Sequence, residues 1–325
     1  MRLTYGTYVS DPEVLRDEVA AAEAVGFEAV YFSEHHGLPG YIANPLAAAT
    51  FVLGCSASLR SGPMPLLLPL HDPVRIAEQA ALVDAISGGR LVMGLGAGFM
   101  PRDFEQCGVP VDERGDRLAE GVTILKRLWQ GDGSAFRGQL LESPKQDPLY
   151  PPPHQPGGPP VWLATGTPAG LRRAAEVADG IAIDSVRSAG DVESLARRFQ
   201  EARAARGKAP GTIAVMRRAW IGPPSEVDPF VASIKSNLEE NAKKASPGGA
   251  PWLDEMGAVT QAAVFDRIFA GTEDEVADQL DAFVDRTKVD EVMVKVQWTS
   301  ATPREQLLDQ LGRWAVVARR TAGGA

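Results

Sequence analysis

Short apolar runs alternate along this chain with longer segments in which apolar residues recur every three or four positions. The first run, LTYGTY at residues 3–8, is typical of a strand. It is followed by Asp11, a helix N-cap residue, by Pro12 at the first helical position, and later by Gly26 as a C-terminal stop. The next apolar run, AVYF at residues 29–32, leads into the sequence SEHHG. The chain therefore opens with a predicted strand–helix–strand unit.

The same unit recurs to the end of the chain. We expect eight strands, nearly all followed by helices, in the segments 3–8, 29–32, 58–70, 90–96, 160–166, 179–185, 212–222 and 290–298. Alternating strands and helices indicate a parallel sheet with right-handed crossovers. Eight such units in 325 residues favour an α/β fold of the closed (β/α)8 TIM-barrel type over an open sheet. No change of composition marks a second domain, so residues 1–325 are predicted to form one domain.

Two segments do not fit a bare barrel. Residues 131–160, after strand 4, are rich in proline and glycine, and residues 223–259, after strand 7, combine a polar helix with the sequence SPGGAPW. We interpret both as insertions. Long irregular loops in compact domains are often lids or binding loops, and residues 245–257 are the candidate lid.

Composition narrows the class of protein. The net charge is −9 with a pI of about 5.1 and no basic stretch, which argues against a nucleic-acid partner. The two cysteines, Cys55 and Cys107, provide no disulfide framework, and this fits a reducing compartment. The N-terminus lacks a signal pattern, and no apolar run approaches membrane-spanning length. We therefore expect a cytoplasmic protein that uses neither nucleic acid nor membrane as a partner.

In a barrel of this type, the chemistry collects where strands end and the following loops begin. The residues expected there are Gly6, Glu34, His35, His36, residues 64–69 and 94–98, residues 165–168, Asp184, Ser185, Trp220 and Trp298. This set is rich in glycine, tryptophan and methionine and poor in paired carboxylates. It favours the binding of a flat cofactor over the hydrolysis of a polar bond.

Two other kinds of site fit the sequence poorly. His35 and His36 are adjacent and point to opposite faces of a strand, while His71 and His154 lie in other loops, so we predict no metal site. The sequence GLGAGF has no glycine in the register that a dinucleotide fingerprint requires. A Rossmann-type nicotinamide site is therefore not expected.

The turn of residues 165–167, Thr-Gly-Thr, ends a predicted strand and precedes Pro168 at the start of a helix. Backbone N–H groups and the helix dipole at such a turn can bind a phosphate. An ordinary N-cap by Thr167 explains the same residues equally well, so both interpretations stay open on the turn alone.

Several long stretches of the chain resemble the bacterial-luciferase-like flavin monooxygenases, a family of (β/α)8 barrels that also includes deazaflavin (F420)-dependent oxidoreductases. The matching stretches are EAVYFSEHH with Asn44-Pro45, LPLHDPVRIAEQAALVDAISGGRLVMGLGAGFMPRDFEQCGV, the helix from Arg114 to LKRLW, PVWLATGTPAGLRRAAEVADGIAID and GTEDEVADQLDAFVDRTKVDEVMVKV. The resemblance covers roughly residues 1–130, 160–220 and 270–320. Only the two insertions fall outside it.

The resemblance implies a reduced flavin at the C-terminal mouth of the barrel. His35 would be the catalytic proton donor or acceptor beside the isoalloxazine ring, with Glu34 as a second catalytic position that orients His36 or forms a buried ion pair. The Met64–Pro65 step matches an unusual cis peptide beneath the ring, and the phosphate would lie at Gly166 and Thr167, near Arg114. The implied cofactor-binding positions are Gly6, Met64, Pro65, Gly96, Ala97, Arg114, Ala164, Thr165, Gly166 and Thr167.

The function implied is that of a two-component monooxygenase. A separate flavin reductase would supply reduced FMN, which reacts with O2 through a peroxyflavin to oxygenate a small, mostly apolar organic substrate. The pocket walls would include Tyr41, Met216, Trp220 and Trp298. Two alternatives stay open: hydride transfer with F420 on the same fold, and a non-catalytic partner subunit. Gly96 and Ala97 replace a thiol and an arginine of luciferase, so no light emission is expected. The family also implies a homodimer.

Overall fold

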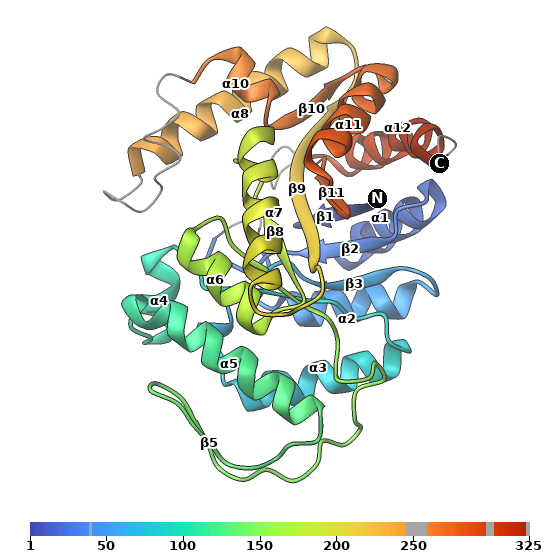
Figure 1. The fold of residues 1–325 in the computed structure, drawn as a ribbon. Helices are drawn as coiled ribbons and strands as arrows, with labels where there is room; N and C mark the ends of the chain where they lie inside the picture. The colour runs from blue at the N-terminus through green and yellow to red at the C-terminus, as the bar shows by residue number, and fades with distance from the viewer. Residues whose placement is uncertain (39–40, 245–258, 297–301, 323–325) are drawn as a thin grey trace.

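Eight parallel strands wind around a common axis with helices on the outside, as the computed structural model of residues 1–38, 41–244, 259–296 and 302–322 shows (Figure 1). The neighbouring strands follow the order β3-β2-β1-β11-β9-β8-β7-β4. Parallel bridges from Ser61 to Leu91 and from Leu66 to Leu95 join the two ends of this order, which brings the sheet nearly to closure. The strands are β1 (Arg2–Thr7), β2 (Ala29–Phe32), β3 (Arg60–Pro63), β4 (Met93–Gly96), β7 (Val161–Ala164), β8 (Gly180–Ile183), β9 (Thr212–Ile221) and β11 (Glu291–Lys295). The predicted (β/α)8 barrel is confirmed.

The helices begin and end largely where the sequence predicts. The Asp11 carboxylate accepts hydrogen bonds from two N–H groups of the first helix, and Gly26 ends that helix with a φ of 96°. The outer helices are α1 (Pro12–Val25), α2 (Pro45–Cys55), α3 (Pro73–Ser87), α5 (Arg114–Trp129), α6 (Pro168–Val177), α7 (Ala189–Ala204), α11 (Glu273–Thr287) and α12 (Arg304–Ala322). Short helical segments are η1 (Leu68–Leu70), α4 (Pro101–Cys107) and η2 (Val111–Glu113). Each cap supplies a partner for backbone groups that a helix end leaves unpaired.

The third strand is shorter than the apolar run predicted. β3 ends at Pro63, and the following PLLLPL run contributes a single bridge and the 3-10 turn η1 instead of a continued strand. Pro65 and Pro69 have no N–H to donate to a ladder, so the run cannot continue as a paired strand. The peptide bond between Met64 and Pro65 is cis.

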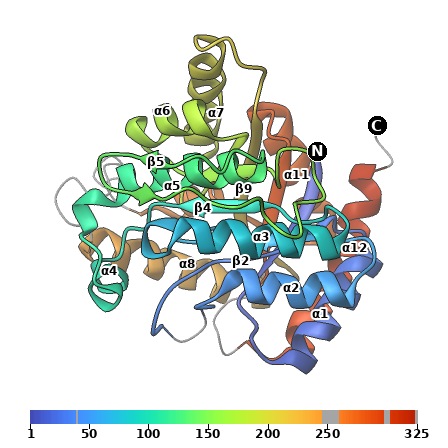
Figure 2. The ribbon, with the colours of Figure 1, turned by 90° about the horizontal axis from the view of Figure 1, so that it is seen from below.

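The two insertions have different positions. The first carries a hairpin of β5 (Phe136–Arg137) and β6 (Glu142–Ser143) that lies along α5 (Figure 2). The Glu120 carboxylate in α5 accepts hydrogen bonds from the N–H groups of residues 139–141. The hairpin therefore covers an outer helix of the barrel.

The second insertion follows the end of a barrel strand. It extends past the predicted end at residue 259, because α8 (Pro224–Lys244) is followed by α10 (Gln261–Phe265) and by β10 (Ile268–Gly271), which pairs in parallel with the end of β9. The candidate lid, residues 245–257, lies outside the described residues. This insertion is thus the one attached to the C-terminal end of the sheet.

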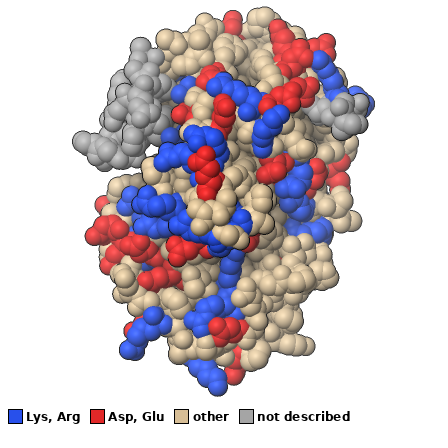
Figure 3. Space-filling model, viewed as in Figure 1, with Lys and Arg blue, Asp and Glu red and all other residues tan. Residues whose placement is uncertain are grey.

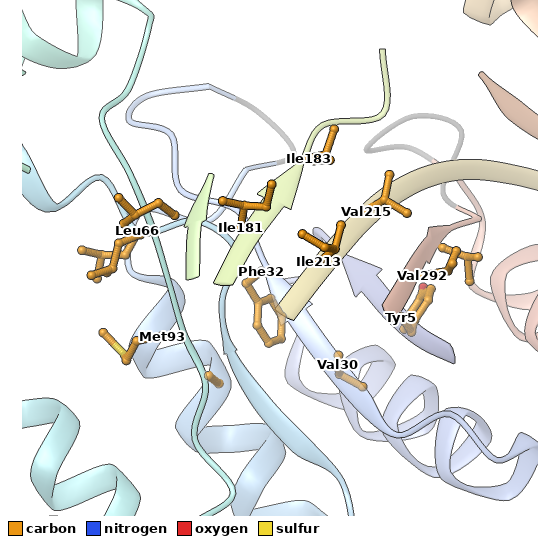
Figure 4. Close-up of a cluster of buried hydrophobic side chains, with 14 of the residues drawn as sticks. Tyr5, Val30, Phe32, Leu66, Met93, Ile181, Ile183, Ile213, Val215 and Val292 are labelled. Carbon is orange, nitrogen blue, oxygen red and sulfur yellow. The ribbon is translucent and has the colours of Figure 1, made fainter. Parts of the chain in front are cut away.

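Side chains of each strand alternate between the barrel interior and the surrounding helices. Val30 and Phe32 of β2 belong to the large cluster between sheet and helices, part of which Figure 4 shows. Ala29 and Tyr31 of the same strand pack in the interior, where Met293 is also buried. Burial of each large apolar side chain contributes roughly 1.5–3 kcal/mol, so both layers stabilise the closed sheet.

Acidic and basic side chains are interspersed over the molecular face in Figure 3. Cys55 and Cys107 are free thiols. Within the described part of the chain, no helix has the length and apolarity needed to span a membrane.

A buried acid ties α1 to β1. The Tyr5 hydroxyl donates a hydrogen bond of 2.9 Å to Glu18, and the Thr7 hydroxyl donates one of 2.8 Å to its other oxygen. Burial raises the pKa of the Glu18 carboxyl from 4.5 to about 7, although these hydrogen bonds favour the charged form.

We expect the Glu18→Gln variant to be more stable than the wild type above pH 7. A raised pKa in the folded state gives stability that is present below pH 4.5 and is lost as the pH rises through about 7. At pH 8 the variant should gain roughly 2–3 kcal/mol in the free energy of unfolding, and at pH 4.5 almost nothing. Urea unfolding at both pH values measures this, with the exposed Glu13→Gln as a control. An equal gain in the free energy of unfolding at both pH values would contradict the raised pKa of Glu18.

Candidate active site

A carboxylate on α4 fixes His35 just beyond the end of β2. The Nδ1 atom of His35 lies 2.9 Å from an Asp103 carboxylate oxygen, and the backbone N–H of His36 donates to the other oxygen at 3.1 Å. Asp103 is completely buried, and the His35 imidazole is 11% exposed. A carboxylate partner makes Nδ1 the protonated nitrogen, so Nε2 is the atom that can exchange a proton with a ligand. Asp103 was not among the residues predicted for the site.

Glu34 has a different set of partners. One of its carboxylate oxygens accepts hydrogen bonds from Nε2 of His36 at 2.8 Å and from Nε2 of His71 at 2.7 Å. The other accepts the backbone N–H of Leu67. Glu34 therefore orients His36, as one interpretation of the sequence predicted, and holds the turn after β2 against η1.

Glu34, His36 and His71 bring their ligand atoms within 4.8 Å of one another, close enough to hold a metal ion. This cluster was not predicted, because His71 lies in a different loop from Glu34 and His36 along the sequence. Hydrogen bonds to both imidazoles already satisfy the buried carboxylate. The absence of a metal site stays a prediction.

Aromatic rings surround His35. The Tyr41 ring packs edge-on against the imidazole with a centroid distance of 4.5 Å, and the Phe99 ring does so at 5.7 Å. Tyr8, just after β1, contacts Tyr41 at 4.8 Å. Tyr41 is 37% exposed and Phe99 76% exposed, so both offer ring surface to a ligand. Tyr41 was expected at the substrate site, and it does lie beside the candidate catalytic imidazole.

A buried lysine that sequence reasoning missed lies next to these rings. Lys295, the last residue of β11, places Nζ 3.3 Å from the Ser33 hydroxyl oxygen and 3.7 Å from the centre of the Tyr8 ring. Ser33 donates its own proton to the carbonyl of Met64 at 2.8 Å, so it accepts from the lysine. Burial, with a smaller contribution from the Arg218 charge, holds the pKa of Lys295 well below its usual range.

The predicted wall residues divide into two groups. Met64 and Met216 pack in the barrel interior together with Met293. Trp220 is completely buried in a separate cluster, where its ring stacks on Phe230 of α8. The structure thus places Trp220 under the second insertion and away from the interior methionines. Trp298 lies outside the described residues.

Two glycines near the strand ends make room for neighbouring side chains. A Cβ atom on Gly6 would lie 2.8 Å from Cε of Lys295, and one on Gly96 would lie 2.9 Å from Cγ of Pro65. Ala97 follows Gly96 and packs at the edge of the main core. Pro65 thus fills the space that a side chain at position 96 would need, and β4 packs closely on the Met64–Pro65 step.

The Thr165–Gly166–Thr167 turn connects β7, which ends at Ala164, to α6. The Thr167 hydroxyl accepts the N–H of Gly170 at 3.1 Å and so caps the helix as predicted. Arg187, which the sequence analysis missed, donates to the Gly166 carbonyl at 3.2 Å. Arg114 starts α5 beside α6: a Cβ on its neighbour Gly115 would come within 2.7 Å of the Arg173 guanidinium carbon.

Comparison with known proteins agrees with this architecture. Residues 2–290 match the family model for luciferase-like monooxygenases. The oxygenase component of a flavin-dependent trigonelline monooxygenase from Acinetobacter baylyi is 31% identical over 150 residues, which are 45% of this chain and 41% of that protein. A 5,10-methylenetetrahydromethanopterin reductase from Archaeoglobus fulgidus is 27% identical over 51% of this chain and 48% of its own. The chain spans about half the length of the curated relatives it matches.

The fold itself is matched over almost the whole chain. The FMN complex of the oxygenating constituent of 3,6-diketocamphane monooxygenase from Pseudomonas putida, a type II Baeyer–Villiger monooxygenase, aligns with a TM-score of 0.81. The alignment covers 99% of this chain and 98% of that one at 16% identity, which bears on the fold alone. Given a family match that extends over nearly all of the sequence and a barrel of the same architecture, the chain belongs to the luciferase-like monooxygenase family.

Proposed function

We propose that this protein is the oxygenase of a two-component system that uses reduced FMN and O2 to oxygenate a small organic substrate. The observation that carries the proposal is the buried Asp103–His35 pair, set among aromatic rings at the strand ends of a luciferase-like barrel. The named relatives that are flavin-dependent oxygenases support the same assignment. No sign of a nicotinamide site is visible in the sequence, so a separate reductase is expected to supply the reduced flavin.

The residues present fit an FMN molecule. Because Gly96 has no side chain, the Met64–Pro65 step packs directly on β4, and this step is the proposed surface beneath one face of the ring. The turn at Gly166 offers a capped helix N-terminus, with Arg187 beside it and Arg114 at the start of the adjacent helix, a donor set suited to a phosphate. Gly6, Ala97, Ala164, Thr165 and Thr167 complete the proposed cofactor positions. Bound reduced FMN would supply the electrons that activate O2.

His35 is the proposed proton-transfer group. Asp103 keeps the proton on Nδ1, and no described residue bonds Nε2, so this atom can take or deliver one proton at the ligand. Asp103 is a positioning residue, since it acts through the imidazole. Glu34 is also proposed as a positioning residue, because its oxygens already accept hydrogen bonds from His36, His71 and Leu67.

The interior methionines form an apolar floor below the strand ends. Met64 is 3% exposed and Met293 5% exposed, so the floor below the proposed ring position is apolar. Tyr41 and Phe99 flank the imidazole. A dry environment strengthens the hydrogen bonds of the site and suppresses unproductive loss of a reactive oxygen species. The proposed assembly is a cytoplasmic homodimer, as the family implies.

The proposal predicts cofactor preference directly. In an anaerobic titration the protein should bind reduced FMN with micromolar or tighter affinity and reduced F420 at least tenfold more weakly, followed by flavin absorbance or fluorescence. Admission of O2 should then reoxidise bound FMN at a rate different from that of free flavin. Preference for F420 would favour the alternative function, hydride transfer on the same fold. Binding of neither cofactor would favour a partner-subunit role.

The Asp103→Asn variant tests the proposed proton-transfer pair. Without the carboxylate, His35 should lose its preference for a proton on Nδ1, which long-range ¹H–¹⁵N correlation spectra of histidine-labelled protein report directly. The rate at which O2 reoxidises bound FMN should change by roughly tenfold or more, as it should in His35→Gln. The FMN dissociation constant should stay within threefold of the wild-type value.

An exposed control, Asp112→Asn, should change none of these properties. An unchanged histidine tautomer in Asp103→Asn would contradict the positioning role. Unchanged reoxidation in His35→Gln would contradict the catalytic role.

A further inference from the structure

Two cations face the mouth of the barrel from neighbouring strands. Lys295 on β11 pairs in register with Arg218 on β9, and Lys295 is only 3% exposed. The inward residues Ala214 and Met216 precede Arg218 by four and two positions, so Arg218 shares their side of β9. It is close enough to Lys295 and to the Tyr8 hydroxyl for its charge to affect both pKa values. The pair therefore concentrates positive charge at one place.

Neither cation pairs with a carboxylate in the part of the chain whose side chains the structure describes. Lys295 has three N–H donors, and it directs one to Ser33 and lies over the Tyr8 ring. Arg218 has five donors and lines a small cavity with Ser185, Asn237 and other residues. Both retain donors for a ligand.

Two buried carboxylates of the candidate active site are already in use, and Asp184, after β8, lies 3.7 Å from Arg187. Asp103 accepts from His35 and from the backbone of His36, and Glu34 accepts from two imidazoles and a backbone N–H. Neither can also neutralise the cations on β9 and β11. A buried ammonium group without an opposite charge is costly, and an anionic ligand removes that cost.

Arg218 lies away from the proposed flavin positions, whereas the Lys295 side chain borders them. In the strand order around the barrel, β11 and β9 are the two central strands, while β3 and β4 are the two ends that close on each other. Arg218 therefore lies across the mouth from the Met64–Pro65 step and Gly96. The Lys295 side chain instead reaches Ser33, whose hydroxyl donates to the Met64 carbonyl, and packs beside Gly6. The phosphate turn after β7 is also displaced from Arg218, being two strands away from β9. A flavin that occupies those positions leaves the β9 side of the mouth for the substrate, with Lys295 at the border between the two ligands.

Aromatic contacts connect the cations to His35. The Tyr8 ring lies against Nζ of Lys295, Tyr41 packs on Tyr8 at 4.8 Å, and His35 packs on Tyr41 at 4.5 Å. Ring edges of this kind favour a planar ligand. A molecule with its charged group at Lys295 would thus have its ring beside the imidazole.

We propose that Lys295 and Arg218 together bind the carboxylate of a small aromatic substrate, whose ring lies against Tyr8 and Tyr41 and reaches His35. The inference rests on the proposed function for the identity of the reaction, and it changes the expected substrate class from mostly apolar to anionic. Lys295 and Arg218 are specificity-determining residues in this arrangement.

Benzoate and its neutral isostere benzamide test the proposal by isothermal titration, with and without saturating FMN. The wild type should bind benzoate at least tenfold more tightly than benzamide, the scale of one charged hydrogen bond. Lys295→Met and Arg218→Gln should each weaken benzoate binding by at least about tenfold and leave benzamide binding unchanged. Arg218→Lys should recover part of the benzoate affinity. The exposed Lys145→Met is the matched control and should behave as wild type.

The outcomes separate substrate from cofactor. Equal affinity for benzoate and benzamide would overturn the proposal, as would variants that lose FMN affinity and keep benzoate affinity, since the cations would then serve the flavin. Because Lys295→Met replaces a buried amine by an apolar side chain of similar length, a thermal melt at least as high as that of the wild type is expected. Failure of the protein to bind FMN would count against the proposed function, while the flavin-free titration would still decide the anion site.

Discussion

In a closed barrel of eight strands, consecutive residues of each strand must point alternately to the inside and to the helices, and this alternation decides which side chains reach the mouth. On β11, Val292 packs against the helices while Met293 is buried inside, so Lys295 also points inward. On β9 the same rule directs Met216 and Arg218 inward. The methionines fill the deep layer, and the cations come last along their strands. The polar chemistry is therefore gathered at one end of an apolar core.

The turn after β2 uses two carboxylates to give adjacent histidines different tasks. Glu34 holds His36 and His71 and thereby fixes the turn to η1, whereas Asp103, from α4, the helix that follows β4, holds His35. The Glu34 carboxylate already accepts three hydrogen bonds, so Asp103 is the carboxylate that sets the orientation of the His35 ring. The His35 imidazole is therefore available to a ligand, while His36 and His71 have a structural role.

Features that depend on local interactions, such as helix ends, could be predicted from the sequence. Contacts that depend on closure of the barrel could not. Caps such as Asp11 and Gly26 act within one turn, so helix ends were predictable. The partner of His35 is 68 residues away and lies within a short helix, at no strand end, so no spacing indicated it. Lys295 belongs to the alternating strand VMVKV, and a polar residue in such a strand usually faces solvent. Because the sheet is closed, this position faces the barrel interior instead. Trp220 had the residue type of a pocket wall, but α8 of the second insertion buries it.

The balance of charge at the mouth differs from that of the whole protein. The chain carries a net charge of −9, and its surface mixes both signs, so the average field would repel a small anion (Figure 3). Charges farther away than about 8–10 Å are largely screened by salt, however, and a buried group responds mainly to its own neighbours. At the strand ends the carboxylates are bound to imidazoles and to backbone N–H groups, while Lys295 and Arg218 lie in register. The local potential is therefore set by the cations, and discrimination between charged and neutral ligands depends on these two side chains and not on the overall charge.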